Sequence, residues 1–205
     1  MISMILLYAI TGYLFGSILF SKLFCLVFHK QDSSENSCDH NPGVFNAFKN
    51  GGFWCGLFAL IGDLAKGFLP IFFYCLHHPL NYAFPILMAA PVVGHLYPLF
   101  YHFKGGKGIT TTFGVLLALW AAGISSWPVW SLAILFLFFK LVIDIKPDLY
   151  ATALVYALLP VIVWFEPVLP LIDRGIVLIT LNVLVKLVFS REQRGKTEVR
   201  FLWMH

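Results

Sequence analysis

The chain has 205 residues, of which 60% are hydrophobic and 12% are charged, and its formal net charge is +4. An ordinary soluble domain carries about 25% charged residues, so this composition excludes a soluble globular domain and indicates an integral membrane protein. The placement of the few charges matters more than their sum, and no nucleic-acid partner is expected. We expect a single domain over residues 1–205.

Seven apolar segments are candidates for helices that cross a bilayer. A spanning helix needs roughly 17–25 mostly apolar residues. The candidate segments are residues 3–28, 53–76, 82–101, 109–124, 128–145, 149–165 and 168–189. The sequence therefore predicts an all-α, polytopic bundle of about seven transmembrane helices. A bundle of five spans with re-entrant segments is the alternative.

Lysine and arginine are distributed unevenly between the connections of these segments. If the N-terminus lies outside, the cytoplasmic connections and tail contain Lys30, Lys49, Lys104, Lys107, Lys146, Arg191, Arg194, Lys196 and Arg200. Near the inner helix ends, where long side chains can snorkel, are Lys22, Lys140 and Lys186. The outer connections contain neither residue type. Only Arg174 lies near an outer helix end, where Asp173 and Glu166 are available as partners. This asymmetry predicts an outside N-terminus and a cytoplasmic C-terminus.

The first segment with chemical content lies in the long cytoplasmic connection, residues 29–52. Asn41-Pro42-Gly43 reads as a turn, and a helical turn after it would place Asn46 and Lys49 on one face. These side chains suit a polar cradle with a cation, and a solvated loop is the alternative. The run Cys38-Asp39-His40 contains metal-ligand types, but without a second cluster no metal site is expected.

Two further polar groups lie inside predicted helices. Asp63 and Lys66 are three residues apart, so that they can pair on one helix. An ionisable pair at membrane depth is costly and by default indicates a functional site, although it can also hold a bundle together. His95, near the inner end of the third segment, is a candidate acid or base, or simply hydrogen-bonds a neighbour.

The most distinctive stretch is residues 102–112, between the third and fourth segments. Glycines let the backbone approach a ligand closely, and the start of the following helix adds N–H groups that bind anions. The candidate ligand-binding residues of this stretch are Lys104, Gly105, Gly106, Lys107, Gly108 and Thr110. The pattern predicts a phosphate-binding loop at the membrane surface. A basic loop held inside only by its charge is the alternative.

A last polar group, Ser190-Arg191-Glu192-Gln193-Arg194, follows the final segment and is either a membrane anchor or a lid over the site. Together, these groups offer cations for phosphates, a glycine-rich backbone and long apolar helices. This combination suits a reaction that joins a phosphorylated, water-soluble substrate to an acyl chain.

These stretches resemble the bacterial acyl-phosphate:glycerol-3-phosphate acyltransferases, the PlsY family. The matching runs are Tyr13-Leu14-Phe15-Gly16-Ser17-Ile18, Asn41-Pro42-Gly43-Val44-Phe45-Asn46, Asp63-Leu64-Ala65-Lys66-Gly67-Phe68-Leu69-Pro70, Gly94-His95-Leu96-Tyr97-Pro98 and Phe103-Lys104-Gly105-Gly106-Lys107-Gly108-Ile109-Thr110-Thr111. The resemblance implies a seven-helix, multi-pass enzyme of the bacterial cell membrane with a cytoplasmic site. Such an enzyme moves an acyl group from acyl phosphate to the 1-position hydroxyl of glycerol 3-phosphate. The product is lysophosphatidic acid for phospholipid synthesis, and neither a cofactor nor a metal takes part.

The chain departs from the family pattern around the acceptor. The family's Ser-Gly-Asn motif is Asp39-His40-Asn41 here, and its threonine before the second asparagine is Phe45. Its arginine is Lys49, which keeps the charge but lacks the bidentate fork. Ser190 and Gln193 stand in place of a histidine and an asparagine. The resemblance therefore implies a retained donor-phosphate site and an altered acceptor site.

By this resemblance the catalytic candidates are Asp39, His40, Asn41 and Lys104. The substrate-binding candidates are Asn46, Lys49, Asp63, Lys66, His95, Gly105, Gly106, Lys107, Gly108, Thr110, Ser190 and Gln193. The expected partners are acyl phosphate, glycerol 3-phosphate or another phosphorylated acceptor, and the lipid bilayer; the oligomeric state is left open. The alternatives are a related acyltransferase with a different acceptor, an inactive lipid-binding relative, or a small transporter. No inverted repeat supports a transporter.

The charge asymmetry predicts the orientation of both chain ends. Reporters fused at Lys30 and at His205 should be active in the cytoplasm, because the lysines and arginines cluster on that side. A fusion within residues 77–81 is the matched control and should report from the periplasm. Periplasmic signals from the first two fusions would overturn the whole placement.

Overall fold

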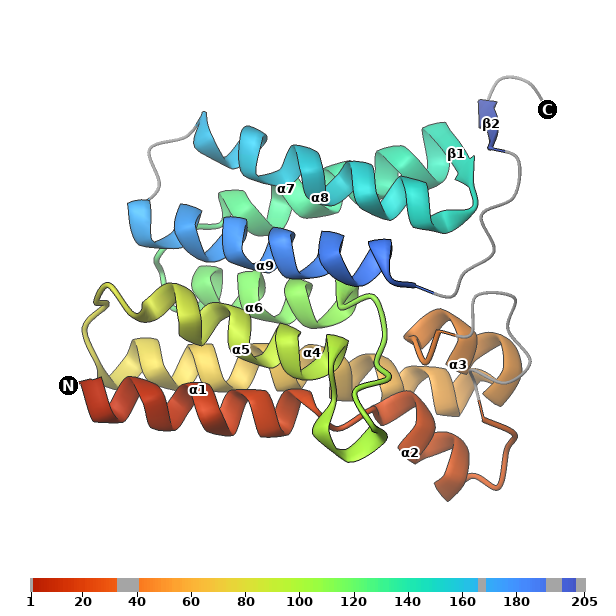
Figure 1. Ribbon diagram of the computed structural model, residues 1–205, viewed down its shortest axis with the longest axis horizontal. Coiled ribbons are helices and arrows are strands. Elements are labelled where there is room, and N and C mark those ends of the chain that lie inside the picture. The colour runs from red at the N-terminus through yellow and green to blue at the C-terminus, as the bar shows by residue number, and fades with distance from the viewer. Residues whose placement is uncertain (1, 33–40, 166–168, 191–196, 202–205) are drawn as a thin grey trace.

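The structure is a computed structural model that describes residues 2–32, 41–165, 169–190 and 197–201. It is mostly helical. The long helices run side by side along one axis and form a bundle, with the N-terminus at one end and a small sheet at the other (Figure 1). This arrangement brings polar connections that are far apart in the sequence to the same end of the bundle.

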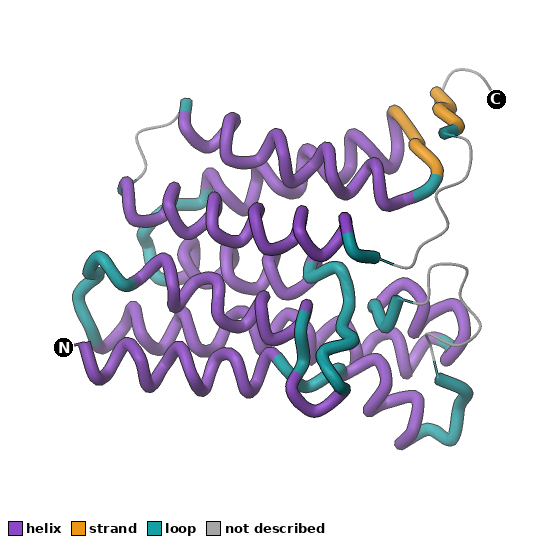
Figure 2. The backbone as a smooth tube through the Cα atoms, in the orientation of Figure 1, coloured by secondary structure: helices purple, strands orange, loops and turns teal. Residues whose placement is uncertain are grey.

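The bundle is built from helices joined by short loops, with a pair of strands at one end (Figure 2). Its helices are α1 Ile2–Gly16, α2 Phe20–Val27, α3 Val44–Gly51, α4 Phe53–His77, α5 Phe84–Leu96, a 3₁₀ turn Leu99–Tyr101, α6 Ile109–Ala121, α7 Trp127–Leu137, a π-helical turn Phe138–Val142, α8 Asp148–Trp164 and α9 Pro170–Val188. The strands are β1 Ile143–Lys146 and β2 Glu198–Phe201. Each of the seven predicted segments overlaps at least one of these helices.

The first predicted segment is broken. The axes of α1 and α2 are bent by 45° at a short break after Gly16. A break frees backbone carbonyls from the helical hydrogen-bond ladder, and in a membrane protein such groups need partners from elsewhere. Here the carbonyl oxygen of Ile18 accepts a hydrogen bond of 2.8 Å from the Lys66 ammonium of α4.

The prediction of one helix over residues 128–145 in an all-α fold is wrong at its end. The helical part ends at Val142, and β1 pairs antiparallel with β2 so that Asp144 faces Arg200 and Lys146 faces Glu198. Ile143 to Lys146 alternate between apolar and charged residues, which is the period of a strand. The partner strand comes from the C-terminal tail and adds opposite charges across the ladder.

Close helix contacts depend on glycine where α4 meets α6. A Cβ atom on Gly67 would overlap the carbonyl oxygen of Thr111, and one on Gly114 would overlap the carbonyl oxygen of Leu64. Small residues let helix backbones approach in membrane proteins, where packing rather than the hydrophobic effect drives helix association. The start of α6, and the loop before it, are thereby fixed against α4.

The outer surface of the bundle is strongly apolar. The most exposed large apolar side chains are 73–80% accessible: Leu26, Phe45, Tyr82, Trp164, Phe165 and Phe189. Large exposed apolar patches are unusual on soluble monomers and suit contact with lipid. Phe53–His77 and Phe84–Tyr101 are long and apolar enough to span a membrane, and the bent pair α1–α2 is a third such unit. Ile109–Ala121, Trp127–Val142 and Asp148–Trp164 are shorter apolar helices, so the count of seven spans stays a prediction.

The glycine contacts predict that one glycine-to-alanine substitution destabilises the protein and that a similar one does not. Gly67→Ala should lower the free energy of unfolding by about 1–3 kcal/mol, because the new methyl group meets rigid backbone. Gly12→Ala is the matched control: its Cβ atom would lie 3.5 Å from Pro70 and Pro91, which is ordinary contact. Thermal unfolding in detergent measures both, and equal behaviour would show that α4 and α6 separate without cost.

Candidate functional site

A buried polar cluster lies where the α1–α2 break, α4 and α5 meet. The Lys66 Nζ atom is 2.8 Å from each of three atoms, namely Asp63 Oδ1, the Ile18 carbonyl oxygen and His95 Nδ1. The side chains of Lys66 and Asp63 are 0% and 1% exposed. The predicted ion pair is confirmed, and the structure adds His95 and a backbone carbonyl to it. The contacts of Lys66 with the Ile18 carbonyl and with His95 are hydrogen bonds. Asp63 Oδ1 is its ion-pair partner and accepts no hydrogen bond within the described residues.

The contact with Lys66 fixes the role of each nitrogen of His95. Since the ammonium can only donate, His95 Nδ1 accepts, and in the neutral ring the hydrogen is then on Nε2. The Nε2 atom lies directly against Gly106, where an added Cβ would overlap it. That same Cβ would also lie 3.1 Å from Asn41 Oδ1. His95 therefore presents an N–H donor to the glycine-rich loop.

The glycine-rich loop folds over the end of α5. The backbone N–H of Gly106 donates to the carbonyl oxygen of His95 at 3.2 Å, and that of Lys104 donates to Tyr101 at 3.0 Å. Gly108, with φ +80°, occupies the left-handed region just before α6, which favours glycine. Lys104 is exposed and Lys107 is half-buried. Two cations and a helix N-terminus thus meet beside the buried cluster, an arrangement that can bind an anion.

The connection before α3 joins the same cluster. Asn46 donates through Nδ2 to the carbonyl oxygen of Asn41 at 2.8 Å, and Ser21 Oγ donates to Pro42 at 2.8 Å. The expected helical turn is confirmed as α3, which contains both Asn46 and Lys49. Asn46 is buried against Asn41, whereas Lys49 is exposed. The structure therefore brings Asn41 and Asn46 to the loop and leaves Lys49 at the surface.

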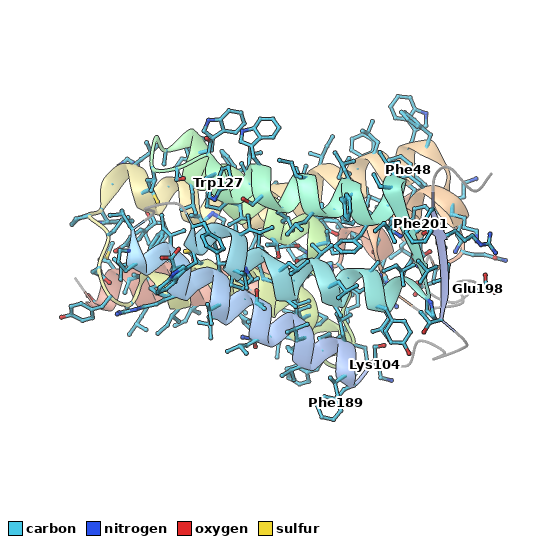
Figure 3. All side chains as sticks on the ribbon, turned by 90° about the horizontal axis from the view of Figure 1, so that it is seen from above. Phe48, Lys104, Trp127, Phe189, Glu198 and Phe201 are labelled. Carbon is cyan, nitrogen blue, oxygen red and sulfur yellow. The ribbon has the colours of Figure 1, made fainter. Side chains whose placement is uncertain are left out.

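Three predicted site residues, Asp39, His40 and Gln193, lie outside the described residues. Ser190 is half-buried directly after α9. Figure 3 shows Lys104 and Phe189 at the same end of the bundle as Glu198 and Phe201, with Trp127 at the other end. The end of α9 and the glycine-rich loop therefore share one face of the protein.

Lys186 is a further cation at the end of the bundle that carries the glycine-rich loop. From its sequence position it is expected only to snorkel. Its Nζ atom lies 5.0 Å from the centre of the Tyr97 ring, within the range of a cation–π contact. Tyr97 is held in turn by α1, because the Tyr13 hydroxyl donates to its carbonyl oxygen at 3.0 Å. The signal available in the sequence is a single lysine one turn before Ser190 in an otherwise apolar segment.

A series of side-chain hydrogen bonds connects the end of the glycine-rich loop to α8 and α9. Thr112 Oγ1 donates to the carbonyl oxygen of Gly108 at 3.0 Å and accepts from the Tyr156 hydroxyl at 2.8 Å. Thr180 Oγ1 donates to the carbonyl oxygen of Tyr156 at 3.3 Å. The loop is thereby tied to α8 and α9. Sequence periodicity does not predict these hydrogen bonds, because the residues that form them come from three different helices.

An apolar groove of about 310 Å³ begins where the loop ends. It runs between α4, α6 and α7, and its lining includes Leu64, Ile109, Thr110, Phe113, Leu117 and Phe136. Thr110 and Ile109 form the first turn of α6, directly after Gly108. The site therefore places a basic, glycine-rich loop next to an apolar groove.

Comparison with known proteins identifies a single family. The model of the family described as glycerol-3-phosphate acyltransferase matches residues 6–196. The glycerol-3-phosphate acyltransferase of Legionella pneumophila subsp. pneumophila (strain Philadelphia 1) is 41% identical over 111 residues, which are 53% of this chain and 39% of that protein. The one of Haemophilus ducreyi is 38% identical over 112 residues, covering 54% of this chain and 55% of the relative. The chain thus spans about two fifths to about half of the length of these relatives.

Two solved structures share the fold. They are crystal structures of PlsY, an integral membrane glycerol 3-phosphate acyltransferase, in its glycerol 3-phosphate form and its lysophosphatidic acid form. The first aligns with a TM-score of 0.74 and 22% identity over 94% of this chain and 96% of that chain. The second aligns with a TM-score of 0.71 and 23% identity over 89% and 87%. Together with the apolar surface, this fold makes the protein a membrane protein.

The buried cluster predicts a non-additive mutant series. Lys66→Met should lower the free energy of unfolding by about 3–5 kcal/mol, because it leaves the Asp63 carboxylate buried without a cation. Combining it with Asp63→Asn should restore much of that loss, since no uncompensated charge remains. Thermal unfolding of both variants in detergent is the measurement. Additive losses would mean that the pair does not act as a unit.

Proposed function

The chain belongs to the glycerol-3-phosphate acyltransferase family, and on that basis we propose that it transfers an acyl group from acyl phosphate to glycerol 3-phosphate. The product would be lysophosphatidic acid, an intermediate of phospholipid synthesis. The names of its relatives support this assignment, as does the chemistry of the site.

The observation that carries the proposal is the position of the glycine-rich loop. It lies between a fixed N–H donor, His95 Nε2, and the apolar groove that begins at Ile109. An acyl phosphate has an anionic head and a long apolar tail, which match the loop and the groove respectively. The buried cluster also argues against a polar transport path, since Lys66 and Asp63 are 0% and 1% exposed and contact each other within the protein.

In this proposal, the loop and the start of α6 hold the donor. Lys104, Lys107 and loop N–H groups other than that of Gly106 hold the phosphate, while the acyl chain lies in the groove along Phe113 and Leu117. The N–H of His95 is directed at the same region, so the ring acts as a hydrogen-bond donor there. It cannot accept a proton at Nδ1 while Lys66 donates to that atom.

Acyl phosphate is already activated, so the reaction needs no covalent enzyme intermediate. The hydroxyl oxygen of glycerol 3-phosphate attacks the acyl carbon, the bond from that carbon to the phosphate oxygen breaks, and inorganic phosphate leaves. The hydroxyl proton passes to a base, for which Asp39, His40 and the phosphate of a substrate are the candidates. The protein contributes positioning and charge neutralisation. Asn41, Asn46 and Lys49 would orient the acceptor, with Ser190 and Gln193 closing the site.

The proposed function also implies an orientation of the protein in the membrane. Residues 1–205 form a single domain that crosses a bacterial cell membrane seven times, with the N-terminus outside and the site at the cytoplasmic face. Support comes from the lysines of the loop and of α9, which gather at one end of the bundle. Both substrates would then reach the site from the cytoplasm or from the inner leaflet.

The assay that tests the proposal follows phosphate release and lipid product from purified protein with acyl phosphate and glycerol 3-phosphate. Lys104→Ala should lower the rate about ten- to a hundredfold, because a hydrogen bond to a charged group contributes about 1.5–3 kcal/mol. Lys30→Ala is the matched control, an exposed lysine outside the loop. If the two variants have the same rate, the loop is only a topological anchor. If the protein ignores acyl phosphate, the proposed function is wrong.

The departures from the family pattern predict a weakened acceptor site. Asp39 stands in place of the family's serine, where a carboxylate would oppose a phosphorylated acceptor because like charges repel. Transfer to glycerol 3-phosphate should therefore be slower than in a member with the full motifs, and Asp39→Ser combined with Lys49→Arg should raise it. A panel of phosphorylated acceptors measures the preference. A wild-type rate equal to that of a full-motif member would contradict an altered acceptor site.

A further inference from the structure

A second and larger groove lies at the end of the bundle away from the glycine-rich loop. It has a volume of about 920 Å³, and its lining comes from the start of α5, the end of α8 and the start of α9. Its walls are apolar, with prolines such as Pro85 and Pro160 and the aromatic residues Tyr82, Trp164 and Phe165. Tyrosine and tryptophan are typical of the boundary between hydrocarbon and headgroups in a membrane.

Two adjacent charged residues of α9, Asp173 and Arg174, also line this groove. Arg174 is exposed and forms no ion pair among the described residues. The Oδ1 atom of Asp173 is buried and has no hydrogen-bond partner in the described part of the chain. A buried polar atom without a partner is costly, so the groove lacks a donor that would complete it. Arg174 is also the one basic residue that departs from the charge asymmetry of the connections.

We propose that this groove binds one phospholipid with a primary ammonium headgroup. The Arg174 guanidinium binds the lipid phosphate, for which its planar fork is suited, and the ammonium group donates a hydrogen bond to Asp173 Oδ1. The acyl chains fill the apolar walls. The opposite charges of the two residues match the zwitterionic headgroup, and the site is independent of the proposed acyl transfer.

The need of Asp173 Oδ1 for a hydrogen-bond donor distinguishes this phospholipid from phospholipids with other headgroups. A trimethylammonium headgroup carries the same charge but has no N–H to donate to Asp173 Oδ1. A glycerol headgroup can donate through a hydroxyl, but its lipid is net negative and brings no cation to the carboxylate. The water-soluble headgroup alone lacks the chains that the apolar walls require.

The test is native mass spectrometry of the full-length protein in detergent with equimolar phosphatidylethanolamine and phosphatidylcholine. We expect one retained lipid per chain and a preference of about tenfold for phosphatidylethanolamine, the effect of one hydrogen bond to a charged group. Asp173→Asn should remove the preference, and Arg174→Gln should reduce retention of both lipids. Arg200→Gln, on β2 at the other end of the bundle, is the matched control and should change neither.

Thermal stability gives an independent readout. Phosphatidylethanolamine should raise the unfolding temperature of the wild type more than that of Arg174→Gln, whereas glycerophosphoethanolamine should have no effect on either. Equal retention of the two lipids, or an unchanged preference in Asp173→Asn, would overturn the proposal. A second copy of the chain in place of lipid in the mass spectrum would also overturn it, because the groove would then be a protein interface.

Discussion

The structure depends on one buried ammonium group. Lys66 on α4 pairs with Asp63 of its own helix and donates hydrogen bonds to the Ile18 carbonyl, at the break between α1 and α2, and to His95 of α5. Burying a cation is costly unless its charge is paired and the group is hydrogen-bonded. This requirement fixes the relative positions of three segments. It also explains why the first span is interrupted, since an intact helix would keep the Ile18 carbonyl within its own ladder.

The orientation of His95 follows from the same group and determines what the site can do. Because Nδ1 accepts from Lys66, the ring offers an N–H through Nε2, which lies against Gly106. The loop can lie this close only because Gly106 has no side chain. A glycine-rich backbone, the N–H group of His95 and an apolar groove are thereby placed next to one another. The proposed transfer needs these three environments, one each for the leaving phosphate, the reacting group and the acyl chain.

The two ends of the bundle differ in charge and in the ligands that suit them. At one end, Lys104, Lys107 and Lys186 gather around the loop, and the tail returns as β2 to pair with β1. At the other end, Asp173 and Arg174 stand beside an apolar groove. A cation-rich face favours small anionic substrates, whereas a balanced pair of charges favours a zwitterionic headgroup. The proposed acyl transfer and the proposed lipid site therefore lie at opposite ends of one bundle.

The sequence by itself determined the features that depend on neighbours along the chain. Apolar runs gave the helices, the i, i+3 spacing gave the Asp63–Lys66 pair, and the Gly-Gly-Lys-Gly run gave the loop. Only the tertiary structure decided the contacts between distant segments. The Ile18 carbonyl, the ring of His95 and the Tyr156 hydroxyl carry no periodic signal, because their partners lie on other helices. The strand β1 was missed for the same reason: a four-residue segment becomes a strand only when a partner supplies its hydrogen bonds, and that partner, β2, lies in the C-terminal tail.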